Sequence, residues 1–430
     1  MDRYIIDGGY KLEGSVRISG NKNGALALLA ASLLCDREVE LLNVPDIADV
    51  QVMIQLIRFL GVTVQMGESG CVRIDPSGLE VIDPELPSSL VDDIRASLLL
   101  LGPILARKGK VALPPPGGDV IGLRRLDTQV SAIEAMGCVV SISTDGYLVV
   151  DGKGLHAGDV FLHEASVITT ENTVMMAVLT PGQTTITNAA CEPHVQDLCR
   201  FLISMGARIE GVGSNLLRIQ GVKSLKDTSF TVGPDYMEVG SFIGLAAATE
   251  SEIEILGVQN DDLRMIETGF ERIGVSWQVT GRHSIIVPAS QSRLMRKSIS
   301  GHTVKIDDAP WPGFPADLLS ILTVSATQMN GSILIHEKMY ESRMFFIDWL
   351  IRMGADIILC DPHRALVNGP TQLRAAQVSS PDVRAGMALI IATLCAQGES
   401  VIQNIYQIER GYEDLPGKLL ALGARIRKED

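Results

Sequence analysis

The segment Leu60-Gly-Val-Thr-Val64 places a glycine between a bulky apolar residue and a run of small and β-branched residues. A glycine in this position is typical of a helix C-terminus, because glycine adopts the left-handed conformation without steric strain. The β-branched residues that follow favour a strand. The same pattern occurs five more times. Its six glycines are Gly61, Gly137, Gly206, Gly274, Gly354 and Gly423, at successive separations of 76, 69, 68, 80 and 69 residues. The sequence therefore predicts six copies of one structural unit.

Each copy also contains a strand and a second helix upstream of its glycine. We expect the strands at 39–44, 111–113, 184–188, 252–256, 332–336 and 400–404. Asn43, Asn188 and Asn404 close three of these strands at the same relative place. We expect the second helices at 23–34, 93–107, 169–179, 237–249, 316–326 and 382–396. These helices are apolar on nearly all sides, which is typical of helices buried in a core.

Six copies divide naturally into three plus three. A break near 231–234, between the third and fourth copies, predicts a first domain at 21–233 and a second domain at 1–20 plus 234–430. The two stretches at 3–7 and 12–18 precede the first copy, and we expect them to pair with strands of the C-terminal half. A cleft between two such domains is the usual place for a ligand.

Composition disfavours several classes of protein. The chain has 430 residues, of which 46% are apolar and 20% charged, so it is not expected to be disordered. Its net charge of −14 and lack of a basic run argue against nucleic-acid binding. Its longest apolar runs reach about a dozen residues, against the ~20 that cross a bilayer, and its start lacks a signal-peptide pattern. Seven scattered cysteines and seven dispersed histidines predict neither disulfides nor a metal site. We therefore expect a cytoplasmic protein.

Cations stand at the start of three of the apolar helices. These cations are Lys22, Arg95 and Arg384. A cation at a helix N-terminus opposes the helix dipole, whereas acidic and hydroxyl residues at the same place are ordinary capping groups. The three cations therefore indicate a bound anion that compensates both the side chain and the helix end.

Four motifs together resemble the enolpyruvyl transferases, and in particular the branch that acts on a nucleotide sugar. They are Ile-Ser-Gly-Asn-Lys-Asn-Gly-Ala at 18–25, Pro-Gly-Gly-Asp-Val-Ile-Gly-Leu-Arg at 116–124, Gly-Phe-Pro-Ala-Asp at 313–317 and Glu-Arg-Gly-Tyr-Glu at 409–413. The resemblance runs from residue 3 to residue 426. It implies an α/β fold, a two-domain inside-out α/β barrel built from six βαβαββ repeats.

The resemblance also implies a reaction. The enolpyruvyl group of phosphoenolpyruvate would move to the 3-hydroxyl of UDP-N-acetylglucosamine with release of phosphate, by addition and then elimination. This is the first committed step of peptidoglycan precursor synthesis. The resemblance implies two small-molecule substrates, no cofactor, no metal and no obligate protein partner.

The resemblance places one cluster of residues around phosphoenolpyruvate. These are Lys22, Asn23, Arg95, Arg124, Arg384 and Arg410, with Arg343 lining the same cleft. Arginine suits carboxylate and phosphate because it binds two oxygens at once. Lys22 and Arg410 would also stabilise charge that develops in the transition state. Asp317 would orient the sugar hydroxyl and accept its proton, and Asp382 would hold the guanidinium of Arg384 in place.

Asp119 stands where the family usually has a cysteine, the acid that protonates the methylene carbon. A free Asp has a pKa near 3.9, so keeping it protonated at pH 7 costs about 4 kcal/mol. We expect Asp119 to become an acid only in the closed complex, where bound polyanions and loss of water raise the pKa of the carboxyl. Fosfomycin alkylates the family cysteine, and a carboxylate is a poorer nucleophile. We therefore expect insensitivity to fosfomycin.

A second set of residues matches the family segments that hold the nucleotide sugar. The set comprises Asn23, Arg95, Arg124, Arg125, Leu126, Asp127, Thr128, Glu164, Ser166, Val167, Ile168, Asp317 and Met339. Many relatives have Lys, His and Gly where Glu164, Gln129 and Ile168 stand here. These departures leave two alternatives open, transfer to a different acceptor or a non-catalytic protein that only binds a nucleotide sugar.

Overall fold

A computed structural model describes residues 2–79, 86, 88–91, 94–118 and 121–429. The chain forms two compact units, each with its own hydrophobic core. The C-terminal unit comprises residues 1–19, 120–123 and 234–430, and the N-terminal unit comprises 20–119 and 124–233. The chain therefore passes from one unit to the other at four places, near residues 19, 119, 123 and 233.

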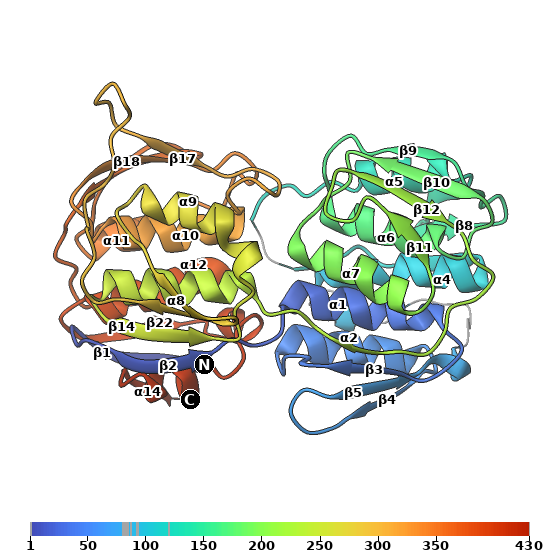
Figure 1. Ribbon diagram of the computed structural model, residues 1–430, viewed down its shortest axis with the longest axis horizontal. Helices are drawn as coiled ribbons and strands as arrows, with labels where there is room; N and C mark the ends of the chain where they lie inside the picture. Colours follow the sequence, from blue (N-terminus) through green and yellow to red (C-terminus); the bar gives the residue numbers. More distant parts are fainter. Residues whose placement is uncertain (1, 80–85, 87, 92–93, 119–120, 430) are drawn as a thin grey trace. The chain divides into compact units, whose positions relative to one another are not determined.

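The described part of the C-terminal unit contains three four-stranded sheets of one design (Figure 1). In each sheet the pairing at one edge is parallel and the other two pairings are antiparallel. The sheets are, in spatial order, β15 (Gln278–Gly281), β16 (Ser284–Val287), β14 (Glu252–Leu256) and β2 (Glu13–Arg17); β17 (Lys305–Asp307), β18 (Gly331–His336), β20 (Arg364–Gly369) and β19 (Asp356–Asp361); and β21 (Gln377–Ser379), β22 (Gly398–Gln403), β1 (Arg3–Gly8) and β23 (Arg425–Glu429). The expected pairing of the first strands with the C-terminal half is confirmed.

The N-terminal unit repeats this design. Its sheets are β13 (Ser229–Thr231), β3 (Val39–Leu42), β5 (Val72–Asp75) and β4 (Thr63–Met66); β9 (Asp159–Phe161), β10 (Gln183–Thr187), β12 (Leu216–Gln220) and β11 (Arg208–Glu210); and β6 (Lys110–Leu113), β8 (Leu148–Asp151) and β7 (Val139–Ile142). The first two again begin with a parallel pair.

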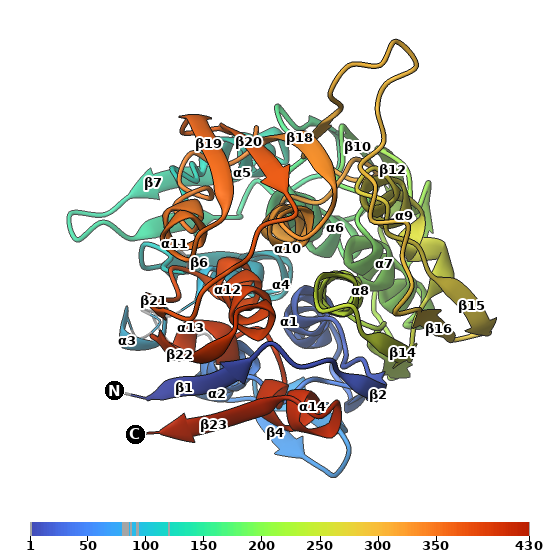
Figure 2. The same ribbon diagram turned by 90° about the vertical axis from the view of Figure 1, so that its left-hand side faces the viewer.

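Apolar helices form the centre of each unit. In the C-terminal unit these are α8 (Tyr236–Ala248), α10 (Ala316–Ala326) and α12 (Val383–Cys395). They are seen near end-on in Figure 2, with the sheets around them. In the N-terminal unit they are α1 (Lys22–Ala31), α4 (Leu101–Lys108) and α6 (Val167–Ala177). The prediction of an inside-out α/β barrel is confirmed, because the helices lie inside the sheets.

The other helices are short or amphipathic. They are α2 (Ala48–Phe59), α3 (Ser88–Val91), α5 (Asp127–Ala135), α7 (Pro193–Ser204), α9 (Arg264–Glu271), α11 (Ile347–Arg352), α13 (Tyr406–Glu409) and α14 (Leu415–Ala421), with 3₁₀ turns η1 (Ser32–Leu34), η2 (Pro76–Gly78), η3 (Arg95–Leu100) and η4 (Asn260–Leu263). Among the described residues, no helix combines the length and the apolar character that crossing a bilayer requires.

The six glycines of the repeat adopt the backbone conformation that the pattern predicts. Each has a positive φ, between 80° and 101°, at the end of a helix. Asn43, Asn188 and Asn404 have φ of 59°, 62° and 58°. Each of the three amides donates to the carbonyl that directly follows the parallel partner strand, at 2.9, 2.9 and 2.7 Å. The repeat therefore extends to single hydrogen bonds.

One predicted helix is wrong in part. The expected helix at 93–107 begins outside the described residues at Asp93, then forms η3, and becomes α-helical only at α4. Pro103 explains the change, because proline has no N–H and its ring clashes with the carbonyl four residues earlier. An α-helix therefore cannot continue upstream through Leu99.

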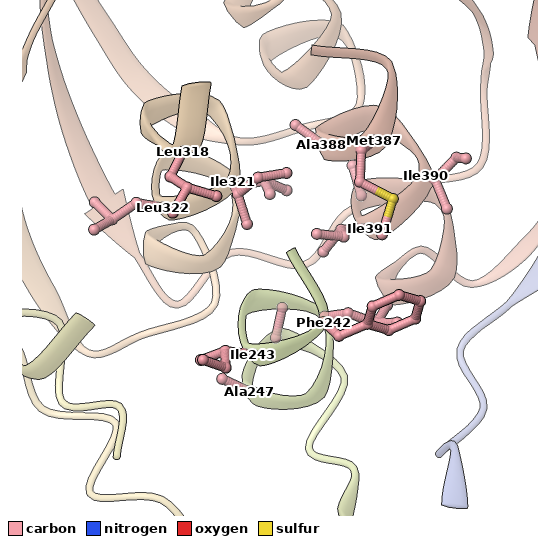
Figure 3. Close-up of a cluster of buried hydrophobic side chains, with 14 of the residues drawn as sticks. Phe242, Ile243, Ala247, Leu318, Ile321, Leu322, Met387, Ala388, Ile390 and Ile391 are labelled. Atoms are coloured by element: carbon pink, nitrogen blue, oxygen red, sulfur yellow. The ribbon is translucent and has the colours of Figure 1, made fainter. Parts of the chain in front are cut away.

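The central helices of the C-terminal unit approach closely through glycines (Figure 3). A Cβ on Gly240 would lie 2.6 Å from Cδ1 of Leu318, and one on Gly244 would lie 2.5 Å from Cγ2 of Ile321. Figure 3 shows Leu318 and Ile321 on α10 among the apolar side chains that α8 and α12 contribute. Glycine lowers helix propensity, so its presence here reflects the contact between the helices.

We expect Gly244→Ala to destabilise the protein. Overpacking costs about 1–3 kcal/mol, and the gain in helix propensity returns about 1 kcal/mol. Urea unfolding followed by far-UV circular dichroism measures the difference. Gly24→Ala in α1 is the matched control, because a Cβ there meets its nearest neighbour at an ordinary 3.4 Å. An unfolding free energy of Gly244→Ala at or above that of the control would contradict the packing argument.

Candidate active site

Asp317 lies between two buried arginines in the C-terminal unit. Its Oδ1 accepts a hydrogen bond from Nη2 of Arg343 at 2.5 Å, and its Oδ2 accepts one from Nε of Arg384 at 3.2 Å. Arg343 and Arg384 are 9% and 4% exposed. Asp317 stands in the first turn of α10, whose N-cap is Pro315. Its carboxylate is thus held by two guanidinium groups from distant parts of the chain.

Both arginines keep a buried nitrogen that has no hydrogen-bond partner in the protein. These atoms are Nε of Arg343 and Nη1 of Arg384. Burial lowers the pKa of Arg343, but the charges of Asp317 and Asp382 outweigh it, so this pKa is raised. For Arg384, burial likewise acts against Tyr412, Asp235 and Asp317, and the pKa is raised. Both side chains therefore remain charged and offer N–H groups to an anionic ligand.

Asp382 lies beside both arginines. It caps α12, accepting hydrogen bonds from the backbone N–H groups of Arg384 and Ala385 at 2.9 Å each. It also forms an ion pair with Arg343 at 3.9 Å. A side chain at the N-cap points back at the helix end, which explains why it meets backbone groups. That Asp382 also holds the guanidinium of Arg384 stays a prediction.

Arg410 and Met339 also lie in the C-terminal unit. Arg410 ends α13, is 5% exposed, and donates to Oε1 of Gln407 at 3.0 Å. Helix α13 packs against α12, which carries Arg384, so Arg410 and Arg384 belong to neighbouring helices. Met339 is exposed. It lies in the turn that leads to Arg343.

Lys22 and Asn23 begin α1 in the N-terminal unit. The cap of α1 is Asn21, whose side chain accepts from the backbone N–H of Gly24 at 2.8 Å. Lys22 forms an ion pair with the buried Asp49 at 2.6 Å. The unfavourable position of this cation at a helix N-terminus is therefore offset within the protein. Asn23 is exposed.

Arg95 and Arg124 also belong to the N-terminal unit, beside the glycine-rich loop. Nη2 of Arg95 donates to the carbonyl of Arg124 at 2.9 Å. Gly118 lies against both, since a Cβ there would be 3.0 Å from Cβ of Arg95 and 3.3 Å from Nη2 of Arg124. Its φ of +101° also suits glycine. Asp119 lies outside the described residues.

The two segments expected to hold the nucleotide meet through their side chains. The hydroxyl of Thr128 donates to Oε1 of Glu164 at 3.3 Å. Ser166 caps α6 and accepts from the N–H of Thr169 at 3.4 Å, which leaves Val167 and Ile168 in its first turn. Around Thr128, Arg125 and Asp127 are exposed and Leu126 is half-buried. The structure therefore brings the two segments together.

Several residues of the site were not predicted. Asp49, Asp235 and Tyr412 were missed as partners of the cations, and Asn21 was missed as the cap of α1. Asp235 lies 4.0 Å from Arg384, and the ring of Tyr412 lies under its guanidinium at 5.2 Å. The Asn21 cap has a local signal, an asparagine directly before an apolar helix. The other three are remote in sequence from the cations they contact. Among the described residues, no His, Cys, Asp and Glu cluster is arranged to hold a metal ion.

Comparisons with known proteins show the family of the chain. A family model described as EPSP synthase (3-phosphoshikimate 1-carboxyvinyltransferase) matches residues 6–419. The chain belongs to the carboxyvinyltransferase family. The UDP-N-acetylglucosamine 1-carboxyvinyltransferase of Treponema denticola is 50% identical to this family member over 430 residues, all of both chains. The protein of the same name from Bradyrhizobium diazoefficiens is 50% identical over 426 residues, 99% of this chain and 98% of the other.

Solved structures of carboxyvinyltransferases show the fold. The enolpyruvyl transferase NikO from Streptomyces tendae has a TM-score of 0.87 at 24% identity, covering 100% of this chain and 99% of that one. EPSP synthase from Acinetobacter baumannii has a TM-score of 0.78 at 17% identity, covering 100% of both chains. At these identities the likeness concerns the fold alone.

We expect Asp49→Asn to destabilise the N-terminal unit, because the buried ammonium of Lys22 loses its countercharge. Breaking a buried ion pair costs about 3 kcal/mol. Far-UV circular dichroism during urea unfolding measures the loss. Asp46→Asn, at an exposed carboxylate three residues earlier, serves as the control and should change stability by less than about 0.5 kcal/mol. Equal stability of the two variants would show that the ion pair is dispensable.

Proposed function

We propose that this carboxyvinyltransferase moves the enolpyruvyl group of phosphoenolpyruvate to the 3-hydroxyl of UDP-N-acetylglucosamine and releases phosphate. It would thus be a UDP-N-acetylglucosamine 1-carboxyvinyltransferase and act in the cytoplasm at the first committed step of peptidoglycan precursor synthesis. The observation that carries the proposal is Asp317 between Arg343 and Arg384, a base next to anion-binding groups. Two full-length relatives with 50% identity bear that name.

Asp317 is the proposed base. Two guanidinium groups each bind one of its two oxygens and so orient the carboxylate. A sugar hydroxyl that hydrogen-bonds to this carboxylate would have its oxygen held toward the reacting carbon. Such positioning, together with proton transfer, contributes about 10²–10⁴-fold to rate.

The proposed phosphoenolpyruvate contacts come from cations in both units. Arg384 and Arg410 belong to the C-terminal unit, and Lys22, Arg95 and Arg124 to the N-terminal unit. The nitrogen of Arg384 without a hydrogen-bond partner supports a role in anion binding, because a buried unsatisfied donor costs free energy until an acceptor arrives. Lys22 and Arg410 are further proposed to stabilise transition-state charge. Asn23 is proposed to donate to substrate oxygens.

The nucleotide-sugar end is proposed to use the joined segments at 124–128 and 164–168. The backbone N–H groups of Val167 and Ile168 at the start of α6, beside Ser166, suit a phosphate. Met339 and Asp317 are proposed to contact the sugar. The 50% identity to nucleotide-sugar enzymes does not favour a different acceptor or a non-catalytic role, despite Glu164, Gln129 and Ile168.

We expect phosphate release from phosphoenolpyruvate with UDP-N-acetylglucosamine and none with shikimate 3-phosphate. Asp317→Asn should lower kcat by about 10²–10⁴-fold, because the amide keeps the size of the side chain and loses its basicity. A coupled phosphate assay measures both. Asp307→Asn, another carboxylate of the same unit, should leave kcat unchanged. Turnover of shikimate 3-phosphate instead would overturn the proposed acceptor.

We expect Asp119 to supply the acid and to make the enzyme insensitive to fosfomycin. Asp119→Asn should lose turnover, since an amide cannot donate this proton. Asp119→Cys should keep turnover and become inactivated by fosfomycin over time, because a thiolate opens the epoxide. Time-dependent covalent inactivation of the unaltered protein, followed by mass spectrometry, would show the expectation to be wrong.

A further inference from the structure

Two carboxyl groups meet at the end of a parallel strand pair in the C-terminal unit. Strands β17 and β18 pair in register with Asp307 opposite His336, so the next residues, Asp308 and Glu337, follow side by side. Both have no exposed surface. They are 29 positions apart in sequence, and neither was singled out from sequence. Two buried carboxyls at one place demand compensation.

Backbone N–H groups of the following turn provide part of that compensation. Asp308 accepts from the N–H groups of Lys338 at 2.5 Å and Met339 at 3.2 Å. Glu337 accepts through Oε1 from the N–H groups of Met339 at 3.1 Å and Tyr340 at 3.0 Å. Because one N–H reaches both carboxyls, the two groups lie close together.

The second oxygen of Glu337, Oε2, is buried and accepts no hydrogen bond from the described residues. Beside the buried Asp308 this oxygen needs a proton, because two ionised carboxylates have only acceptors. Burial, the hydrogen bond to Asp308 and the charge of Asp308 raise the pKa of Glu337 to about 9, against a smaller opposite effect of Arg343. At pH 7 Glu337 is therefore protonated.

Other charged and titratable groups surround the pair. Arg343 and Tyr340 lie on the turn itself. His363, from the turn between β19 and β20, bonds through its backbone carbonyl to the N–H of Glu337 and through Nδ1 to the carbonyl of Glu337, both at 2.8 Å. On the outside, Asp307 forms ion pairs with Lys338 at 2.6 Å and Lys305 at 3.3 Å.

The turn that the pair holds contains groups of the candidate site. It leads from Lys338 to Arg343, whose guanidinium binds Asp317. Next to Arg343, the N–H of Ser342 donates to the carbonyl of Ile121 at 3.1 Å, and Glu341 accepts from the N–H of Leu123 at 3.3 Å. The turn thus contacts the described end of the loop that contains Asp119.

We propose that Glu337 and Asp308 are positioning residues that share one proton and thereby hold the turn 338–343, with Arg343 seated against Asp317. The part of this inference that concerns turnover rests on the proposed function. Loss of the shared proton places two buried negative charges side by side and releases the turn. Turnover therefore falls at alkaline pH, because the released turn no longer holds Arg343 against Asp317.

A stability measurement tests the shared proton without any assay of activity. All three tryptophans, Trp277, Trp311 and Trp349, belong to the C-terminal unit, so their fluorescence reports its unfolding alone. The raised pKa of Glu337 contributes stability that is complete below its ordinary pKa of 4.5 and is lost as pH rises toward about 9. Between pH 4.5 and about 9, the ratio of the wild-type unfolding constant to that of Glu337→Gln should therefore rise about tenfold per pH unit.

A kinetic measurement tests the positioning. Glu337→Gln keeps a neutral side chain of the same size, so we expect kcat within about threefold of wild type at pH 7. At pH 10 a carboxyl with a pKa near 9 is about nine-tenths ionised. The kcat of the wild type should therefore fall about tenfold at pH 10 through ionisation of Glu337, whereas Glu337→Gln should retain its activity. Glu337→Ala should lose up to about a hundredfold in kcat at both pH values, because the turn shifts. Asp307→Asn, at the neighbouring surface carboxylate, should behave as wild type.

Hydrogen exchange of the amides at 338–340 gives a third readout, corrected for the intrinsic effect of pH. We expect protection in the wild type at pH 7, its loss at pH 10, and protection of Glu337→Gln at both. Equal pH slopes of stability for wild type and Glu337→Gln would overturn the shared proton. If wild type and Glu337→Gln differ in the pH slope of stability but share the same pH profile of kcat, the positioning role is wrong. Absence of wild-type turnover would count against the proposed function alone, and the exchange pattern would then decide whether the turn is held.

Discussion

The matching of buried charge at the amino ends of buried helices is the constraint on which the site depends. Central helices that are apolar on all sides offer no solvent to a charged side chain, so a cation there needs a partner within the protein. Asp317 meets this need for Arg384, and Asp49 meets it for Lys22. Cations held in this way remain charged and ready for an anion, and the protein stays stable without one.

Local rules account for most of the architecture. The six helix-ending glycines, the apolar central helices and the strands between them follow from propensity and periodicity, and the structure confirms them. The error at 93–107 also has a local cause, Pro103, which a stricter use of the rules on proline would have detected. The fold was thus predictable because each repeat carries its own signals.

The site was predictable only where resemblance supplied the residues. Arginines and carboxylates were named as a set from the resemblance, but their partners within the protein were not, because contact between residues such as Asp308 and Glu337 depends on strand pairing. Even Asp382, two positions from Arg384, binds the backbone of that residue because a helix cap dictates where its side chain points. Charge pairing in a fold with this many long-range contacts cannot be derived from spacing along the chain.

Strand β1 lies between β22 and β23, so the first strand of the chain pairs with strands formed close to its C-terminal end. During synthesis, β1 emerges before its partners by some four hundred residues, counted as the separation of Tyr4 and Ile402. The amide of Asn43, by contrast, bonds to Val232, which is synthesised only 189 residues later. During synthesis the N-terminal unit is therefore complete while β1 and β2 still lack their partner strands. The C-terminal unit, which contains the first residues of the chain, is completed last.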